Sequence, residues 1–311
     1  MRDIANVSYL SSDGPQDSGC VRSSEPVEPR GGGRPANFGD ASGDRQTSPG
    51  GAVLPGPCSR AGITCQNAAD VARAGDGRNP ETDDERSQLI EIESTRLIRW
   101  AGANSFWVDS RILQTLLVQP AHGGNPIGGA EHFVHAFSDD RAEVGVRIWK
   151  ITRNGRFGFV PSCDASGSMP REWLRLRWAT PSEYLQRLDL LNFLAPETET
   201  RLEGFALVDG NFHVITSQRY FKIEGESPTP EEVDKYFEDF GFVALLATGG
   251  PDSLTSAWYH EGDNLAVFDA WADNFILYDG RLFPVDVIPV EPGPDMAELI
   301  NHALALPLDS R

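Results

Sequence analysis

The stretch FDAWADNFILYDGRLFPVDV, residues 268–287, places polar side chains in a sequence that otherwise has the composition of a protein core. Asp269, Asn274 and Asp286 stand there among phenylalanine, isoleucine, leucine and valine residues. A buried carboxylate is costly unless another group compensates for its lost hydration, and a metal ion is the usual compensator. The stretch therefore indicates a polar site inside the fold and raises the question of whether a metal ion binds there.

The amino-acid composition changes near residue 85 of the 311-residue chain. The preceding segment is rich in Gly, Pro and Ser, with runs such as GGGRP, SPGG and PGP, and has few large apolar residues. Such a segment buries too little apolar surface to offset its conformational entropy, which is typical of disorder. All seven Trp residues follow Glu85. The sequence thus predicts a disordered extension over residues 1–85 and one folded domain over residues 86–311.

Charge and cysteine usage exclude several classes of partner. The formal charge of −19 and the lack of any Lys or Arg run argue against nucleic acid as a partner. No stretch is apolar for long enough to span a bilayer, and no signal-peptide pattern is present, so no membrane partner is expected. Cys20, Cys58 and Cys65 fall in the predicted extension, and Cys163 is alone in the folded part. Without a C-x-x-C pair or a disulfide framework, a reducing, cytoplasmic location is predicted.

Local patterns predict the elements of the folded part. Helical periodicity and start signals predict helices over residues 85–101, 179–194 and 229–242. A Gly-rich turn over residues 123–131 precedes a strand over residues 143–152, and Lys150 ends the apolar face of that strand. Two further strands over residues 202–218 are joined by an Asp-Gly turn. The carboxylate-bearing stretch follows the last helix.

This order of elements is that of a protein-kinase-like fold, which is α+β and has two lobes. The sequence predicts a strand-rich lobe over about residues 86–217 and, after a hinge, a short second lobe within residues 218–311. In kinases the catalytic-loop Asp precedes a metal-binding Asn by five positions, and a metal-binding Asp follows later. Asp269 and Asn274 are five positions apart, and Asp286 follows twelve positions after Asn274.

Several motifs in series carry a resemblance to a known family. They are GGAEHFVHAF, VRIWKITRNGRFG, TPSEYLQRL, HVITSQ, TPEEV, WYHEG and DAWADNFI…GRLFPVDV. Together they resemble the serine/threonine/tyrosine-kinase-like domains of polyvalent proteins of phages and other mobile elements, from about residue 86 to the C-terminus. The resemblance implies a kinase-like fold that binds ATP and Mg²⁺ and transfers the γ-phosphate to a hydroxyl acceptor on a protein or small molecule.

The resemblance also implies a role for each matching residue. Asp269 matches the catalytic-loop Asp, which accepts the proton of the acceptor hydroxyl or orients that hydroxyl. Asn274 and Asp286 match the two metal ligands, and Lys150 matches the strand lysine that holds the α- and β-phosphates. The glycines that would let the backbone approach the nucleotide are Gly128 and Gly129.

The acidic partner of Lys150 has two candidates. Glu183 lies in the predicted helix at residues 179–194, where it also completes a capping box with Thr180. Glu131 is adjacent to the Gly-rich turn. Without metal, Asp286 is expected to lie beside the like charge of Asp269 with no cation nearby. Replacement by Asn should then leave the apo protein as stable as the wild type, or more stable.

Departures from the kinase pattern define the alternative function. Val267 and Phe268 precede Asp269, where kinases have His-Arg. Val287 and Ile288 follow Asp286, where kinases have Phe-Gly. The Gly-rich turn also does not match the kinase pattern G-x-G-x-x-G. Only residues 287–311 follow Asp286, which shortens the second lobe. The complete Lys-Asp-Asn-Asp set favours a phosphotransferase. The departures favour a kinase-fold module that binds nucleotide or a protein partner without turnover.

Overall fold

A computed structural model of the protein describes residues 63–75, 82–118, 131–138, 146–153, 155–163, 174–221, 227–245 and 256–305. All of these residues belong to one compact unit of the chain. The unit combines helices with antiparallel sheets, so the α+β class predicted from the sequence is confirmed. Among the described helices, none combines the length and apolar composition needed to cross a bilayer.

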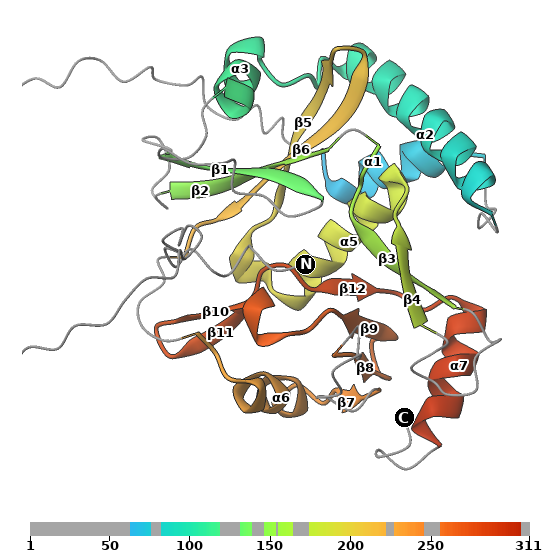
Figure 1. The fold of residues 1–311 in the computed structure, drawn as a ribbon, viewed down its shortest axis with the longest axis vertical. Helices are drawn as coiled ribbons and strands as arrows, with labels where there is room; N and C mark the ends of the chain where they lie inside the picture. The colour runs from blue at the N-terminus through green and yellow to red at the C-terminus, as the bar shows by residue number, and fades with distance from the viewer. Residues whose placement is uncertain are drawn as a thin grey trace, which may run out of the picture. The chain divides into compact units, whose positions relative to one another are not determined.

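The first sheet contains four antiparallel strands in the order β1-β2-β6-β5 (Figure 1). Their bounds are β1 His132–Ser138, β2 Val146–Thr152, β5 Arg201–Val208 and β6 Asn211–Arg219. The predicted Asp-Gly turn joins β5 to β6, because Asp209 and Gly210 both have positive φ, as a tight hairpin turn requires. Strand β2 is flanked by β1 and β6, and its consecutive residues 149–152 are all buried, so both faces of this part of the strand are covered.

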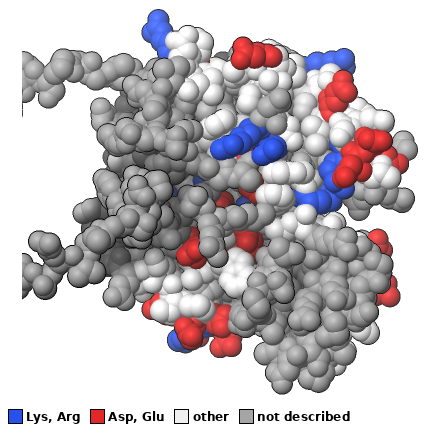
Figure 2. Space-filling view, in the orientation of Figure 1, with Lys and Arg blue, Asp and Glu red and all other residues white. Residues whose placement is uncertain are grey.

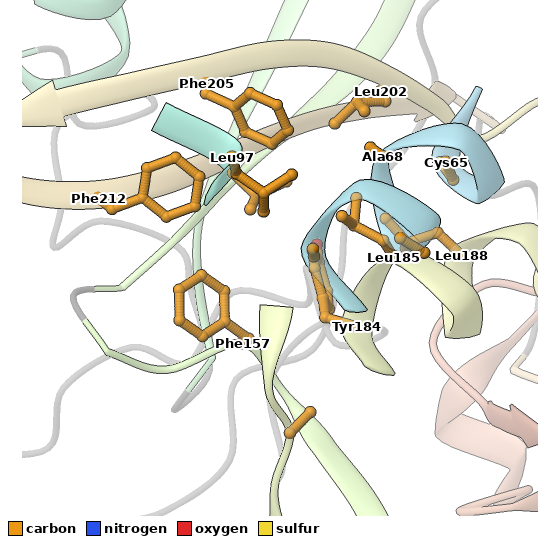
Figure 3. Packing of buried hydrophobic residues seen from close by; sticks show 14 of the residues in the cluster. Cys65, Ala68, Leu97, Phe157, Tyr184, Leu185, Leu188, Leu202, Phe205 and Phe212 are labelled. Carbon is orange, nitrogen blue, oxygen red and sulfur yellow. The ribbon is translucent and has the colours of Figure 1, made fainter. Parts of the chain in front are cut away.

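Helices α1 (Cys65–Arg73), α2 (Asp83–Asn104) and α5 (Pro181–Leu194) cover the first sheet. Each begins after a Thr N-cap in a capping box, formed by Thr64, Thr82 and Thr180. Figure 3 shows α1 and α5 side chains packing together below the aromatic residues of β5 and β6. A further helix, α3 (Ser110–Val118), follows α2.

Helix α1 corrects the predicted boundary at residue 85. Its Cys65, Ala68, Ala69 and Ala72 are buried in the core between α2 and α5. Small side chains allow helices to approach closely, so this segment contributes to the core mainly through alanines, with the partly buried Ile63 and Val71 packed against it. The composition therefore concealed a packed helix. The rest of the predicted extension, residues 1–62, lies outside the described part of the chain.

The second part of the unit follows β6. Its sheet has the order β12-β9-β8-β7, and β10 and β11 form a separate hairpin. The bounds are α6 Pro230–Asp239, β7 Val243–Ala244, β8 Trp258–His260, β9 Leu265–Phe268, η3 Ala272–Asn274, β10 Phe275–Tyr278, β11 Arg281–Pro284, β12 Ile288–Val290 and α7 Pro294–Leu304. A short hairpin of β3 (Phe159–Cys163) and β4 (Leu174–Trp178) precedes α5, and η2 (Pro196–Thr198) follows it.

Helix α5 lies between the first sheet and strand β12 (Figure 1). It therefore contacts both parts of the unit and can present side chains to the segment that joins β11 to β12. The lobe boundary predicted after residue 217 falls inside β6, which ends at Arg219. Residues 222–226, which follow, are outside the described part.

Candidate functional site

Lys150 reaches the candidate site from the first sheet. On the central strand β2 it pairs in register with Val134 and Thr216, and it is 6% exposed. Its Nζ lies 3.4 Å from the carbonyl oxygen of Val285 and 3.4 Å from Oδ1 of Asp286. The lysine thus bonds directly to a segment more than 130 positions further along the chain.

Asp286 and Asn274 are fixed relative to each other by the backbone. Asp286 lies between β11 and β12, and the neighbouring Val285 N–H donates to the carbonyl oxygen of Asn274 at 2.9 Å. The Asn274 side chain donates through Nδ2 to the carbonyl oxygen of Asp269 at 2.6 Å. One continuous set of hydrogen bonds therefore joins the three polar residues of the opening stretch.

Asp269 directly follows β9 with φ of 54°, in the left-handed region that Asp tolerates better than most residues. The Ala270 N–H donates to the Ser256 carbonyl at 3.1 Å and holds this turn. Burial, followed by the negative charge of Asp286, raises the pKa of the Asp269 carboxyl to about 6. The Arg187 guanidinium and the Asn274 side chain oppose part of this rise.

Arg187, on α5, is a site residue that the sequence analysis missed. Its Nε donates to the Val287 carbonyl at 3.3 Å, and its Nη2 donates to the Asp286 carbonyl at 3.3 Å. Nη2 also lies 3.7 Å from Oδ1 of Asp286, and Nη1 lies 3.4 Å from Oε2 of Glu131. A charged residue among Tyr184, Leu185 and Leu188 on the buried face of α5 was the signal available in the sequence.

Of the two acidic candidates for pairing with Lys150, Glu131 lies in the charged cluster and Glu183 does not. Glu183 binds Arg177 at 2.8 and 2.5 Å and accepts from the Thr180 N–H at 2.9 Å. The structure therefore does not bring Glu183 to Lys150. Glu131 does reach the cluster: burial raises the pKa of its carboxyl, whereas the charges of Arg187 and Lys150 act to lower it.

The sequence predicted that Asp286 would have no cation nearby in the apo protein, and the structure contradicts this prediction. Two cations, Lys150 and Arg187, contact its carboxylate, so the protein itself supplies the compensating charge that the sequence analysis sought in a metal ion. Both contacts involve the same oxygen, Oδ1. Their positions explain how a carboxylate remains in a largely buried segment.

Two further residues border the cluster. His132 is buried, with Nε2 2.9 Å from the Tyr184 hydroxyl, and burial together with the nearby cations Lys150 and Arg187 holds its pKa well below the usual value. Gly158 has φ of 83°, and a Cβ atom there would lie 2.9 Å from Nη1 of Arg187. Only glycine fits this position without displacing the guanidinium. Gly128 and Gly129 lie outside the described residues.

The donor set suits a nucleotide-bound Mg²⁺. The closest approaches of Lys150 and Arg187 to the Asp286 carboxylate are both to Oδ1, and the Asn274 side chain donates through Nδ2 to a backbone carbonyl. Carboxylate and amide oxygens are ligands that Mg²⁺ accepts, and with phosphates present it needs only one or two protein ligands. No group of three or more described His, Cys, Asp or Glu residues could hold a metal ion, which excludes an all-protein cage among those residues.

Comparison with known proteins identifies a family that part of the chain resembles. Residues 175–289 match the family model described as "Serine/Threonine/Tyrosine Kinase found in polyvalent proteins". No curated protein and no solved structure matches the chain. The matched segment contains Arg187, Asp269, Asn274 and Asp286, and it ends before the last helix, α7. The resemblance inferred from the motifs is thus confirmed over this segment, and residues 175–289 are similar to the kinase domains found in polyvalent proteins.

Proposed function

We propose that the protein is an ATP- and Mg²⁺-dependent phosphotransferase with a kinase-like, two-lobed fold, which moves the γ-phosphate to a hydroxyl acceptor on a protein or small molecule. The observation that carries this proposal is the contact between Lys150 on β2 and Asp286, whose segment is hydrogen-bonded to Asn274. Chance would not be expected to assemble a phosphate-binding lysine with the matching metal ligands from distant elements. The family match over residues 175–289 supports the same reading.

Each residue then has a chemical role. Lys150 would contact the α- and β-phosphates, and Asn274 and Asp286 would hold Mg²⁺, which would neutralise phosphate charge. Asp269, with a pKa of about 6, is mostly ionised at neutral pH and can accept the proton of the acceptor hydroxyl. The hydroxyl oxygen forms the new bond to the γ-phosphorus as the bond from that phosphorus to ADP breaks. We also propose a cytoplasmic location, because Cys65 and Cys163 are free thiols.

One observation favours the second candidate, a module that binds nucleotide or a protein partner without turnover. Lys150 is engaged with Asp286 in this structure, so it must leave that carboxylate to reach phosphates. The residues before Asp269 are Val267 and Phe268, which lack the polar groups that kinases place there. A protein that stays in this arrangement would bind partners without catalysing transfer.

The experiment that separates the candidates has two stages. Thermal shifts with ATP, in the presence and absence of Mg²⁺, measure binding, and γ-³²P-labelled ATP then measures transfer to the protein or to added acceptors. The variant Asp269→Asn should keep the affinity for Mg²⁺-ATP and lose transfer, because the carboxylate faces the acceptor. Binding without transfer in the wild type would favour the module. Absence of Mg²⁺-ATP binding would contradict the phosphotransferase and the nucleotide-binding module, and would leave only a module that binds a protein partner.

A further inference from the structure

The helix next to the phosphate-binding lysine contributes an arginine to the site, not a carboxylate. Arg187 is 5% exposed and lies between the Asp286 segment on one side and Glu131 on the other. Glu183, a carboxylate on the same helix, binds Arg177 and the N-terminus of α5 instead. Helix α5 therefore presents a positive charge, that of Arg187, to the site.

The guanidinium of Arg187 holds the backbone around Asp286. Nε and Nη2 donate to two consecutive carbonyl oxygens, those of Val287 and Asp286, each at 3.3 Å. Nη2 also lies 3.7 Å from the Asp286 carboxylate. A planar fork of donors can make such a set of contacts at once, whereas the single ammonium of a lysine cannot. Arg187 thus fixes both the position and the orientation of Asp286.

Lys150 and Arg187 share one oxygen of Asp286, but their roles on nucleotide binding must differ. A lysine that moves to the phosphates gives up its 3.4 Å contact with Oδ1. After Lys150 has moved, the described contacts that remain to the Asp286 carboxylate and carbonyl are those from Arg187. They keep both the carboxylate and the backbone carbonyl of Asp286 in contact with the guanidinium.

We propose that Arg187 is a positioning residue, which keeps Asp286 oriented for Mg²⁺ when Lys150 transfers to the nucleotide phosphates. Glu131 holds Arg187 in place, with Oε2 3.4 Å from Nη1, and Gly158 leaves the space that the guanidinium occupies. This inference rests on the proposed function and adds to it a coupling between α5 and the metal ligand. Residues that orient metal ligands typically change metal affinity about 10- to 100-fold when they are replaced.

The test measures Mg²⁺ affinity at saturating ATP by calorimetric titration in the wild type, Arg187→Met and Arg187→Lys. Arg187→Met should weaken Mg²⁺ binding about 10- to 100-fold and leave metal-free ATP binding nearly unchanged, since Lys150 is intact. Compared with Arg187→Met, Arg187→Lys should recover part of the melting temperature, because the positive charge remains. It should not recover the Mg²⁺ affinity, because the planar set of guanidinium donors is lost. If transfer activity is present, KM for Mg²⁺ should rise more than kcat falls.

Arg177→Met is the matched control. It removes a guanidinium that also contacts α5, through Glu183, but that does not contact the Asp286 segment. Its Mg²⁺ affinity should equal that of the wild type. An equal loss in Arg177→Met and Arg187→Met would show a general effect of loosening α5 and would overturn the proposal.

Two other variants test the same contact if Arg187→Met fails to fold. Glu131→Gln removes the charge that holds Nη1, and Gly158→Ala places a Cβ atom against the guanidinium without removing any charge. Each should weaken Mg²⁺ binding by about tenfold. Wild-type Mg²⁺ affinity in every folded variant would overturn the role of Arg187 and leave the proposed function standing. Absence of Mg²⁺-ATP binding by the wild type would overturn both.

Discussion

The two carboxylates of the site, Asp286 and Asp269, differ in how far nearby positive charges compensate them. Asp286 has two cations on one oxygen, whereas Asp269 has burial and the like charge of Asp286 against it, offset in part by Arg187 and the Asn274 side chain. The pKa of Asp269 is accordingly raised to about 6. This difference gives the two neighbouring carboxyl groups different properties in the apo protein, and two predictions depend on it.

The first prediction concerns the pH dependence of stability through Asp269. Its pKa is about 6 in the folded protein and about 3.9 in an unfolded chain, so the folded state binds more protons between these values. The stability that this group contributes is present at low pH and is lost as pH rises through about 6. From pH 5 to pH 8, the free energy of unfolding of Asp269→Asn should therefore gain about 1 kcal/mol relative to the wild type. Urea unfolding at both pH values measures it, and parallel pH profiles would contradict it.

The second prediction reverses a sequence-based expectation about Asp286. The sequence suggested that Asp286→Asn would leave the apo protein equally stable or more stable. In the structure this change leaves Lys150 and Arg187 near each other without the carboxylate that both contact. We expect a loss of about 1–3 kcal/mol, reduced from the full cost of breaking a buried pair because Asp286 is partly exposed. Urea unfolding at pH 7 without Mg²⁺ checks this; an unchanged or raised midpoint would restore the sequence-based expectation.

At the scale of elements, α5 separates its charged residues by face. Glu183 completes the capping box at the N-terminus of the helix and binds Arg177, and Arg187, one turn later, faces the Asp286 segment. The apolar residues Tyr184, Leu185 and Leu188 contact α1 and the first sheet (Figure 3). One helix therefore joins the core to the site, and its packing decides where the Arg187 guanidinium lies.

The third prediction tests the packing of α1 against α5. Deletion of residues 1–75 removes the buried Cys65, Ala68, Ala69 and Ala72 and exposes the apolar residues of α5 that they cover. We expect the free energy of unfolding to fall by more than about 2 kcal/mol. Deletion of residues 1–62 keeps α1 and is the control, with an expected melting temperature close to that of the full chain, because that segment has few large apolar residues. Equal melting temperatures of the two deletions would show that α1 contributes no stability.

At the scale of the whole molecule, the negative charge is unevenly distributed. The chain carries −19, yet residues 146–187 contain more Lys and Arg than Asp and Glu. On the face shown in Figure 2, Lys and Arg side chains lie mainly in the upper half, and Asp and Glu side chains predominate in the lower half. A strongly acidic protein can thus offer a local positive environment to the phosphates of a nucleotide.

The sequence by itself determined the features that depend on neighbouring residues. Capping boxes located the starts of α5 and α6, a left-handed Asp-Gly turn located the hairpin of β5 and β6, and the five-residue spacing of Asp269 and Asn274 identified the polar turn after β9. These signals are local because hydrogen bonds of caps and turns join residues only a few positions apart. The family resemblance likewise needed only the order of short motifs.

Only the tertiary structure decided which charges meet. Lys150 bonds to Asp286, Arg187 bonds to Glu131 and the Asp286 segment, and Glu183 turns to Arg177. A helical pattern shows that residues 183 and 187 are neighbours, but not which of them faces a segment about 100 positions away. The same holds for α1, whose alanines carry no strong apolar signal and become core residues only because α2 and α5 approach closely enough to exclude water.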